Sequence, residues 1–400
     1  PERAKLETII SQFDNAGEGD PENISVAKVS VSLSYRDLKY RSKESSLVLL
    51  AKGLKTVDVV AILGEKGFSV IASMLGVLRS GGVTLTIDDY LPEKRKALMI
   101  NETNAQYIIA AGENKHTQKE LEGEKYLYID SVDAALYTAD DVISESSHLT
   151  DLNLENPSYI FFKSGSTGKP KAILGSNKGL AHFIQWQGDT FEITAEDRVS
   201  QLTSLTFDVI LRDVFLPLTR GACSCIPQDD DYEILPWIEE NGLTVMHTVP
   251  GTMVSRLQVS QNNYDFSKLR YMFFSGEALT GALINKLKHR CKGDFRIINL
   301  YGPTEATMVK SWYEVPVDYL SGTQSIGSPL PNAQFLIMGK GGQICGINEP
   351  GEIAIRTPYR TLGYVDDNSN TGKFITNTFS GDEDDVVNLT GDLGRIRPDG

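Results

Sequence analysis

The sequence predicts an α/β fold made of two parallel-sheet subdomains and a small β-barrel. The chain has 400 residues, more than a single hydrophobic core usually serves, so two or three packed subdomains are expected. Apolar runs alternate with amphipathic stretches over most of the chain, which is typical of parallel strands connected by helices. After about residue 325, short strand candidates separated by Gly and Pro replace this alternation and indicate a β-rich part.

A β-α-β unit is predicted early in the chain. Residues 59–63 form an apolar run, residues 68–78 have the spacing of an amphipathic helix, and residues 83–87 form a second, mainly apolar run. The alternation recurs at 234–240, 243–249, 271–274, 280–289 and 295–300. We therefore predict a first α/β subdomain over residues 1–190, a second over 191–324, and a β-rich, barrel-like subdomain over 325–400. Strand candidates in the last part are 334–338 and 352–356.

The composition argues against several classes of protein. The net charge is -14 and no cluster of Lys and Arg stands out, which argues against nucleic-acid binding. No apolar run is long enough to span a bilayer, and the polar first residues do not resemble a signal peptide, so we expect a cytoplasmic location and no membrane association. The four cysteines lack paired metal-ligand spacing, and we expect them to be reduced.

One segment, residues 159–171, has the composition of a phosphate-binding loop. A strand-like run leads into glycines, hydroxyl side chains and lysines. Small residues let backbone N–H groups approach an anion, and Lys171 can neutralise the charge on a leaving pyrophosphate. The spacing is not that of a Walker A loop, and a solvent loop with chance Gly and Ser is the alternative. The candidate phosphate-binding residues are Ser164, Gly165, Ser166, Thr167, Gly168 and Lys171.

This segment resembles the signature loop of the adenylate-forming superfamily. Further motifs follow in the order found in nonribosomal peptide synthetase adenylation domains. They are residues 33–38 (LSYRDL), 78–92, 207–208 (FD), 299–305 (NLYGPTE), 351–364 and 390–393 (TGDL). The resemblance covers the whole chain. It implies the large domain of an acyl-adenylate synthetase, with ATP and Mg²⁺ as cofactors.

Three positions depart from that family's pattern. Lys163 stands where a Thr is usual, Ala172 where a Gly is usual, and Leu362 where an Arg is usual. The first two changes remove no group that ATP binding needs, and Leu362 touches no reacting atom. Lys163 either adds positive charge near the phosphates or points to solvent.

The resemblance assigns nucleotide-binding roles residue by residue. Glu305 would hold Mg²⁺, which prefers carboxylate and phosphate oxygens, or else be an exposed Glu in a first helical turn. Tyr301 would offer its ring to adenine, or pack in the core. Asp392 would accept both ribose hydroxyls, or be an ordinary turn residue. The candidate catalytic residues are Lys171, Thr167 and Glu305. The other candidate nucleotide-binding residues are Gly276, Glu277, Ala278, Asn299, Leu300, Gly302 and Thr304.

The resemblance also implies an amino-acid pocket. Its positions in this sequence are Asp208, Val209, Arg212, His247, Phe273, Ser275, Leu300, Met308 and Val309. In amino-acid-activating members, an Asp at the position of Asp208 pairs with the α-ammonium of the substrate. Members that activate aryl or keto acids usually lack this Asp. An amino acid is therefore the expected substrate.

Arg212 is the unusual member of this set. If residues 208–215 are helical, Asp208 and Arg212 lie on one face and both reach one cavity, unless they pair with each other. A guanidinium among apolar side chains is costly unless an anion meets it, and a second substrate carboxylate is the natural anion. His247 would add a hydrogen bond, or be a satisfied histidine of the core.

The set of Asp208, Arg212 and His247 resembles the pocket of family members that take acidic amino acids. We therefore expect aspartate or β-methylaspartate, glutamate or aminoadipate as the substrate. Activation is expected at the side-chain carboxyl, with Asp208 and Arg212 holding the ammonium and the α-carboxylate. The reverse orientation is the alternative.

In this family a small C-terminal subdomain follows the last motif and presents the thiol of a carrier protein. The sequence stops at Gly400 before such a subdomain, so we expect it to bind ATP and amino acid but to adenylate weakly. The expected partners are a phosphopantetheine-bearing peptidyl carrier protein domain and other synthetase domains. The alternatives are the adenylation part of an aminoadipate reductase-like enzyme, an acyl-CoA ligase, which Asp208 disfavours, and a non-catalytic nucleotide-binding module.

Overall fold

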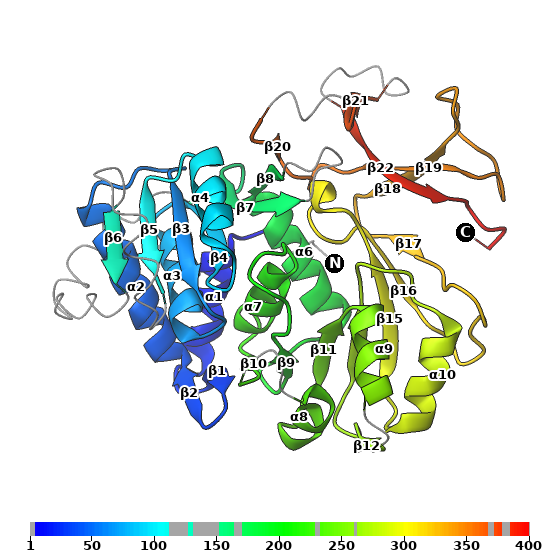
Figure 1. The fold of residues 1–400 in the computed structure, drawn as a ribbon, viewed down its shortest axis with the longest axis horizontal. Coiled ribbons are helices and arrows are strands. Elements are labelled where there is room, and N and C mark those ends of the chain that lie inside the picture. Colours follow the sequence, from blue (N-terminus) through cyan, green and yellow to red (C-terminus); the bar gives the residue numbers. More distant parts are fainter. Residues whose placement is uncertain are drawn as a thin grey trace. The chain divides into compact units, whose positions relative to one another are not determined.

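The computed structural model describes residues 5–111, 127–130, 152–163, 170–228, 233–259, 262–366, 372–377 and 385–399. The chain divides into two compact units, Pro1–Asp230 and Asp231–Gly400. Both units combine helices with largely parallel sheets, which confirms the predicted α/β class (Figure 1). The finer division at residues 190 and 324 stays a prediction.

The first unit contains a sheet whose strands follow the order β8-β7-β4-β3-β5-β6. The strands are β3 (Val59–Gly64), β4 (Val83–Asp88), β5 (Tyr107–Ala110), β6 (Leu127–Asp130), β7 (Pro157–Lys163) and β8 (Lys171–Ser176). β7 and β8 pair antiparallel, and the other neighbours pair parallel. Helix α3 (Phe68–Arg79) connects β3 to β4, and α4 (Glu93–Glu102) follows β4. The β-α-β unit predicted between residues 59 and 87 is therefore confirmed, with each end within one residue.

The centre of this sheet is buried on both faces. Successive residues of β4 are all buried, and so are those of β3 after its first residue. Leu63, Leu85, Ile108 and Ile160 belong to one apolar cluster formed by these neighbouring strands. β3 is a continuous apolar run, as expected for a strand buried on both faces. β4 instead alternates apolar residues with Thr84 and Thr86, whose hydroxyls donate to the carbonyls of Ser158 at 3.1 Å and Leu205 at 2.6 Å.

A second sheet in the first unit has the order β9-β10-β1-β2 and was not predicted. Its strands are β1 (Ile24–Lys28), β2 (Val31–Ser34), β9 (Arg198–Ser200) and β10 (Cys223–Ile226).

The remaining helices of this unit are α1 (Ile9–Gly19), α2 (Tyr35–Ala51), α6 (Asn177–Thr190) and α7 (Ile210–Leu218). Thr8, Ser34 and Ser176 cap the first three, because each side-chain oxygen accepts a backbone N–H of the first turn.

The second unit contains a sheet with the strand order β17-β16-β15-β13-β11. The strands are β11 (Val245–Thr248), β13 (Tyr271–Phe274), β15 (Arg296–Tyr301), β16 (Ser311–Glu314) and β17 (Ser328–Pro329). β11, β13 and β15 are parallel, and β16 and β17 are antiparallel to their neighbours. The helices are α8 (Ile234–Glu240), α9 (Pro250–Val259) and α10 (Gly281–Arg290), and β12 (Tyr264–Asp265) pairs with β14 (Cys291–Lys292). The predicted alternation between residues 234 and 300 is confirmed.

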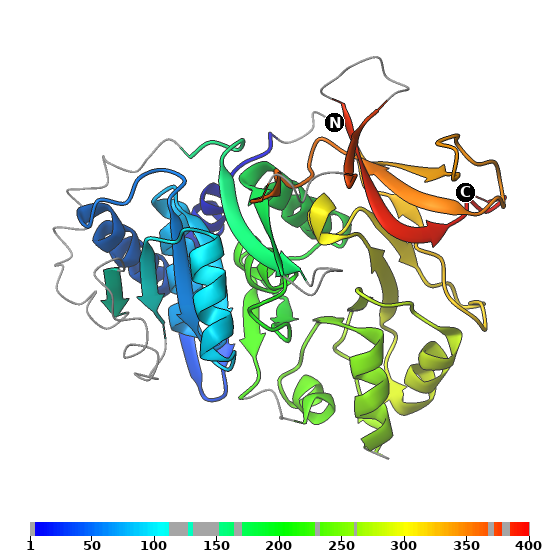
Figure 2. The same cartoon turned by 45° about the horizontal axis from the view of Figure 1, so that its top comes forward.

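The β-rich last part forms a four-stranded antiparallel sheet with the order β18-β19-β22-β21, drawn in orange and red in Figure 2. Its strands are β18 (Gln334–Met338), β19 (Gly351–Arg356), β21 (Phe374–Thr376) and β22 (Val386–Gly394), and the short β20 (Gly363–Tyr364) precedes β21. The strand candidates 334–338 and 352–356 are confirmed as β18 and β19. Across the described ranges, no helix is long and apolar enough to cross a bilayer.

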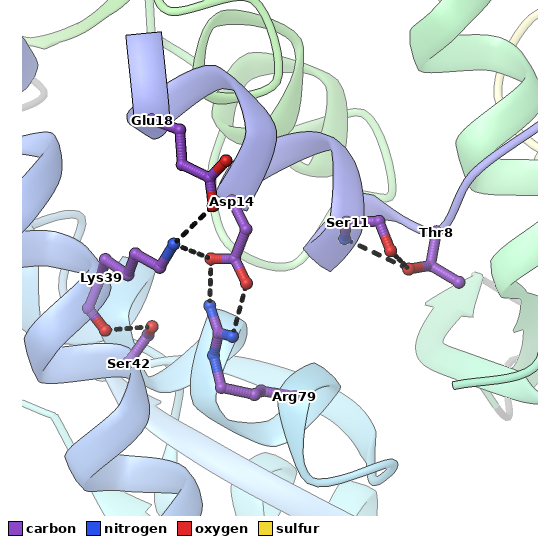
Figure 3. A network of polar contacts seen from close by, with 7 residues as sticks. All are labelled: Thr8, Ser11, Asp14, Glu18, Lys39, Ser42 and Arg79. Carbon is purple, nitrogen blue, oxygen red and sulfur yellow. Dashed lines mark hydrogen bonds and ion pairs between the residues drawn. The ribbon is translucent and has the colours of Figure 1, made fainter. Parts of the chain in front are cut away.

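A polar network connects three helices of the first unit (Figure 3). Both terminal nitrogens of Arg79, at the end of α3, donate to the carboxylate of Asp14 on α1 at 2.8 Å. Lys39 of α2 lies 3.5 Å from Asp14 and 3.8 Å from Glu18. The Arg79 side chain is 2% exposed and that of Asp14 is 25% exposed, so the bidentate pair is largely withdrawn from water.

We expect Asp14→Asn to destabilise the protein, because it leaves the buried Arg79 guanidinium without its carboxylate. Breaking a buried ion pair costs about 3–5 kcal/mol, and the partial exposure of Asp14 reduces the expected loss to roughly 2–3 kcal/mol. The free energy of unfolding in urea measures it. Glu18→Gln is the control, because the Glu18 side chain is 72% exposed and a change below about 0.5 kcal/mol is expected.

The same pair predicts an acid dependence. Burial by itself raises the pKa of Asp14, but the hydrogen bonds and positive charges of Arg79 and Lys39 outweigh it and lower the pKa below 3.8. The contribution of Asp14 to stability is therefore present above that value and is lost as the pH falls through the lowered pKa. The difference between wild type and Asp14→Asn should shrink over this acid range. A difference that stays constant with pH would contradict the pairing.

Candidate functional site

The carboxyl ends of three parallel strands lie together in the second unit. The last residues of β11 and β13, Thr248 and Phe274, pair in register, and Phe274 pairs with Asn299 of β15. The N–H of Ser275 donates to the carbonyl of Thr248 at 3.2 Å, which keeps the chain leaving β13 close to β11. In α/β proteins, ligands bind at such an edge, outside the carboxyl ends of the strands.

Tyr301 and Asp392, predicted separately to contact adenine and ribose, lie next to each other. The Tyr301 hydroxyl at the end of β15 donates to Oδ2 of Asp392 on β22 at 2.7 Å. Burial raises the pKa of Tyr301, and the hydrogen bond and charge of Asp392 raise it further despite an opposing contact with Thr390. The hydroxyl is therefore a stable donor at neutral pH. Asp392 is exposed, and a carboxylate can accept additional hydrogen bonds.

Glu305 lies in the short 3-10 helix η4 (Thr304–Ala306) and is 2% exposed. The alternative of an exposed Glu in a first helical turn is therefore wrong. The Tyr364 hydroxyl of β20 donates to Glu305 Oε1, and Thr361 donates to the Glu305 carbonyl through its hydroxyl at 2.7 Å and its N–H at 3.1 Å. These contacts come from more than fifty residues further along the chain and bury the carboxylate.

A carboxylate held in this way has the donor chemistry that Mg²⁺ prefers. Mg²⁺ usually binds one or two carboxylates and completes its shell with phosphate oxygens and water. In the part of the chain that the structure describes, no group of three or more His, Cys, Asp or Glu side chains forms a ready-made metal site. The residues present therefore fit an ion that enters with phosphates better than an ion held by the protein alone.

Other predicted nucleotide-binding residues serve internal contacts. The side-chain amide of Asn299, 4% exposed, donates to the Ser325 carbonyl at 2.8 Å. Oε2 of Glu277 accepts the N–H of Gly251 at 2.8 Å, at the first turn of α9, where a negative charge is favourable. Gly276 has a φ of 89°, which is readily adopted only by glycine. Ala278 follows this bend and belongs to no helix or strand.

The predicted phosphate loop lies partly outside the described residues. Ser164, Gly165, Ser166, Thr167 and Gly168 all fall in the undescribed range 164–169. On either side of it, Lys163 ends β7 and Lys171 begins β8, and the two pair directly in the antiparallel register. Lys163 is exposed and Lys171 is half-buried. Two cationic side chains thus stand at the base of the predicted loop.

In the first unit, the structure corrects the expected environment of Arg212. Nε and Nη2 of Arg212 donate to Oδ1 of Asp213 at 3.1 and 2.9 Å, and Oδ2 of Asp213 accepts the Thr203 N–H at 3.1 Å. The side chains of Arg212 and Asp213 are 2% and 0% exposed. The buried Arg212 guanidinium therefore already has an anion from its sequence neighbour, and a substrate carboxylate is not needed to offset its burial.

The expected helix over residues 208–215 also begins later than predicted. α7 starts at Ile210 with Val209 as its N-cap, so Asp208 precedes the helix. The one-face geometry of residues four apart in a helix does not apply to Asp208 and Arg212. Asp208 is 8% exposed, and its backbone carbonyl accepts the Leu211 N–H at 3.1 Å.

The pocket candidates of the second unit are mostly core side chains. The ring of His247 on β11 stacks on that of Phe273 on β13, with centroids 4.8 Å apart and 20° between the ring planes. This environment agrees with the alternative of a histidine packed in the core. The side chains of His247, Phe273, Leu300, Met308 and Val309 are at most 2% exposed, and Ser275 is half-buried.

Three residues that contact the predicted site residues, Tyr364, Thr361 and Asp213, could not be assigned a role from the sequence. Tyr364 and Thr361 lie in the motif at 351–364, yet no role followed from their residue types alone. Asp213 carries no such signal, because neighbouring helical residues point in different directions, yet the long Arg212 side chain reaches it. The position of Tyr364 directly after Gly363 in this motif is the one feature of the sequence that could have indicated a role for its hydroxyl.

The fold and this arrangement define a class of α/β proteins with a candidate nucleotide site at strand carboxyl ends. The family model described as AMP-binding enzyme matches residues 13–365, so the chain belongs to the AMP-binding enzyme family. The predicted resemblance to nonribosomal peptide synthetase adenylation domains is also confirmed.

Individual relatives agree with this family. The chain is 28% identical over 413 residues to tyrocidine synthase 1 of Brevibacillus parabrevis, covering 99% of this chain and 36% of that protein. It is 28% identical over 452 residues to L-2-aminoadipate reductase of Saccharomyces cerevisiae, covering 97% of this chain and 32% of that protein. The chain thus spans only a part of either relative.

A solved structure has the same fold. The nonribosomal peptide synthetase FmoA3, in its S1046A variant, superimposes with a TM-score of 0.87 at 23% identity, covering 100% of this chain and 42% of that chain.

We expect Tyr364→Phe to lower the free energy of unfolding by about 1–3 kcal/mol, because it leaves a buried Glu305 oxygen short of a donor. Burial, the hydrogen bond and the charge of Glu305 all raise the pKa of Tyr364, so the loss should be constant through neutral pH. Denaturant unfolding measures it. Tyr319→Phe, at a half-buried ring in the same unit, is the matched control. Equal stability of the two variants would show that the Tyr364 hydroxyl does not support Glu305.

Proposed function

We propose that this chain activates an amino acid as an aminoacyl adenylate. A carboxylate oxygen of the amino acid attacks the α-phosphorus of ATP, the bond from that phosphorus to the bridging oxygen breaks, and pyrophosphate leaves. Positioned charges rather than a covalent enzyme group accelerate such a reaction. The observation that carries the proposal is the hydrogen bond between Tyr301 and Asp392, in a chain of the AMP-binding enzyme family.

The proposed nucleotide roles follow from the contacts in the second unit. Tyr301, with its hydroxyl fixed by Asp392, would present its ring to adenine, and Asp392 would accept the ribose hydroxyls. Glu305, oriented by Tyr364, would hold Mg²⁺. When bound, Mg²⁺ neutralises phosphate charge. The other nucleotide-binding candidates, including Gly302 and Thr304 of the motif that carries Tyr301, remain part of the proposal.

Lys171 and Thr167 would handle the phosphates. Lys171, at the start of β8, would stabilise the negative charge that develops on the leaving pyrophosphate. Thr167 would donate its hydroxyl from the loop between β7 and β8. Lys163, which pairs with Lys171 across the two strands, adds a second cation at the base of this loop and supports its role as an anion site.

We expect Asp392→Asn to raise the KM for ATP about tenfold, because hydrogen bonds to a charged acceptor contribute about 1.5–3 kcal/mol and 1.4 kcal/mol corresponds to a factor of ten. The KM for the amino acid should change less than about twofold. ATP–pyrophosphate exchange by the intact protein measures both constants. Asp318→Asn, at an exposed position of the same unit, is the control. An unchanged KM for ATP in Asp392→Asn would contradict the nucleotide assignment.

An amino acid is the proposed substrate because of Asp208. Its carboxylate lies in a largely buried position directly before α7, where a substrate ammonium would find a partner away from bulk water. Aryl and keto acids have no such ammonium. The acyl adenylate would then pass to the phosphopantetheine thiol of a carrier protein domain: the sulfur attacks the acyl carbon, and AMP leaves.

We further propose that the amino acid is acidic and reacts through its side-chain carboxyl. Arg212 supports this, because a buried guanidinium in the set of pocket candidates offers a planar site for a carboxylate. The Asp213 carboxylate counts against it, because the pair with Arg212 is already neutral. A second candidate function is the adenylation part of a reductase-like enzyme. The similarity to L-2-aminoadipate reductase over 97% of this chain supports it as well as the similarity to the synthetases supports the first.

We expect pyrophosphate exchange to be fastest with an acidic amino acid in a panel of aspartate, β-methylaspartate, glutamate, aminoadipate, leucine and phenylalanine. The double variant Arg212→Met with Asp213→Asn removes the guanidinium without leaving a buried carboxylate charge. It should reduce kcat/KM for the acidic substrate about 100-fold or more, which corresponds to about 2.7 kcal/mol. Exchange with only neutral amino acids in the wild type would overturn the acidic assignment.

Two controls belong to this experiment. Asp213→Asn alone keeps the guanidinium and should keep the preference for acidic substrates. Esters of each carboxyl separate the two orientations: exchange with the ester of the α-carboxylate means that the side-chain carboxyl reacts, and exchange with the ester of the side-chain carboxyl means that the α-carboxyl reacts.

A further inference from the structure

The segment directly after η4 has an unusual backbone. Thr307 and Met308 are consecutive non-glycine residues with φ values of 67° and 58°. The left-handed region is costly for residues with a Cβ atom, and two such residues in succession persist only where the surrounding structure holds them. Met308 and its neighbour Val309 are both candidates for the amino-acid pocket, so this backbone determines where two of its side chains lie.

Lys310 holds this turn from within. The Lys310 side chain is 0% exposed, and its ammonium donates to the carbonyl of Thr307 at 2.9 Å and to that of Val309 at 3.1 Å. The two acceptors flank Met308 on either side. Burying an ammonium is expensive, and charged hydrogen bonds to buried carbonyls are the interactions that offset the cost. The lysine thus bridges the carbonyl groups at both ends of the left-handed turn.

The turn is also fixed to the motif that carries Tyr301. The Lys310 N–H donates to the Tyr301 carbonyl at 2.8 Å. Gly302 lies against the same backbone: a Cβ atom at Gly302 would come within 2.5 Å of the Met308 carbonyl oxygen and 2.7 Å of the Val309 Cα. Only glycine allows this approach. One end of the turn is therefore anchored by backbone contacts, and the Lys310 ammonium fixes the conformation of the rest.

We propose that Lys310 is a positioning residue for the amino-acid substrate. It acts through Met308 and Val309, whose placement depends on the turn that its ammonium bridges. The proposal rests on the proposed function, because it takes these two residues as pocket residues. Lys310 does not contact the reacting atoms, so its replacement should affect amino-acid recognition more than ATP binding.

Lys310→Met tests the proposal, because it keeps a long apolar chain and removes both hydrogen bonds. We expect the KM for the amino acid to rise about tenfold, the loss typical of one charged hydrogen bond, while the KM for ATP changes less than about threefold. Discrimination between amino acids that differ by one methylene should also weaken. Lys310→Arg retains the charge and the donors and should recover part of the loss. Lys340→Met, at an exposed position of the same unit, should behave as wild type.

A purely structural lysine would lower stability without separating the two KM values. Equal changes in both constants, or an unchanged amino-acid KM in Lys310→Met, would therefore overturn the proposal. If Lys310→Met does not fold, Lys310→Gln retains an amide donor for one carbonyl and is measured in the same way.

A second measurement separates this proposal from the proposed function. Hydrogen–deuterium exchange over residues 303–311 should be faster in Lys310→Met than in Lys340→Met, whatever the reaction is. If the wild type exchanges pyrophosphate with no amino acid, the proposed function fails, and the exchange of these amides then decides whether Lys310 holds the turn. Unchanged protection of the segment would rule out the bridge.

Discussion

The in-register parallel pairing of β11, β13 and β15 is the constraint on which the candidate site of the second unit depends. All four residues of β13 are buried, and a slip by one residue would turn each side chain to the opposite face. The pairing of His247 with Phe273, and of Phe273 with Ile298, fixes the three strands against one another. The bend at Gly276, which follows β13, and the motif at residues 299–305, which begins within β15, are positioned by this register.

Charged groups that this fold buries are satisfied in different ways. Arg79 receives a carboxylate from another helix, so its pair ties α1 to α3. Arg212 receives a carboxylate from its own neighbour, so that pair joins no separate elements, although Asp213 also accepts the Thr203 N–H. Lys310 donates to the backbone carbonyls of Thr307 and Val309. A pair between elements stabilises packing, whereas an ammonium bound to local carbonyls stabilises a particular backbone conformation.

Long periodic segments could be predicted from the sequence because their spacing reflects local geometry. The helix at residues 68–78 and the strands at 271–274 and 334–338 agree with α3, β13 and β18 to within one residue. β1 and β10 could not be predicted in the same way, because they are short and pair although they lie near the two ends of the first unit. Nothing in the sequence of either strand indicates which strand it pairs with.

The residues of the candidate site, like the strands, could be predicted from the sequence only where local motifs indicate them. Tyr301 and Asp392 could be named from their motifs, but their hydrogen bond depends on how β15 and β22 fold together. The burial of Glu305 could not be foreseen either, because Thr361 and Tyr364 reach it from a distant segment. Residue type indicates which groups can act on a ligand. Tertiary contacts decide which of them are already engaged within the protein.

The pair of Arg212 and Asp213 shows why this distinction matters for the proposed acidic substrate. A lone buried guanidinium would attract any carboxylate strongly, whereas a neutral pair adds no net charge and selects a ligand through directional hydrogen bonds. An acidic substrate would then have to match the geometry of the paired guanidinium, at a cost for desolvating its own carboxylate. Selectivity of that kind depends on how precisely the surrounding side chains are placed. Because Asp213 also accepts the Thr203 N–H, the orientation of the Arg212 guanidinium is held by a second segment besides its own helix, and that orientation would decide which carboxylates fit.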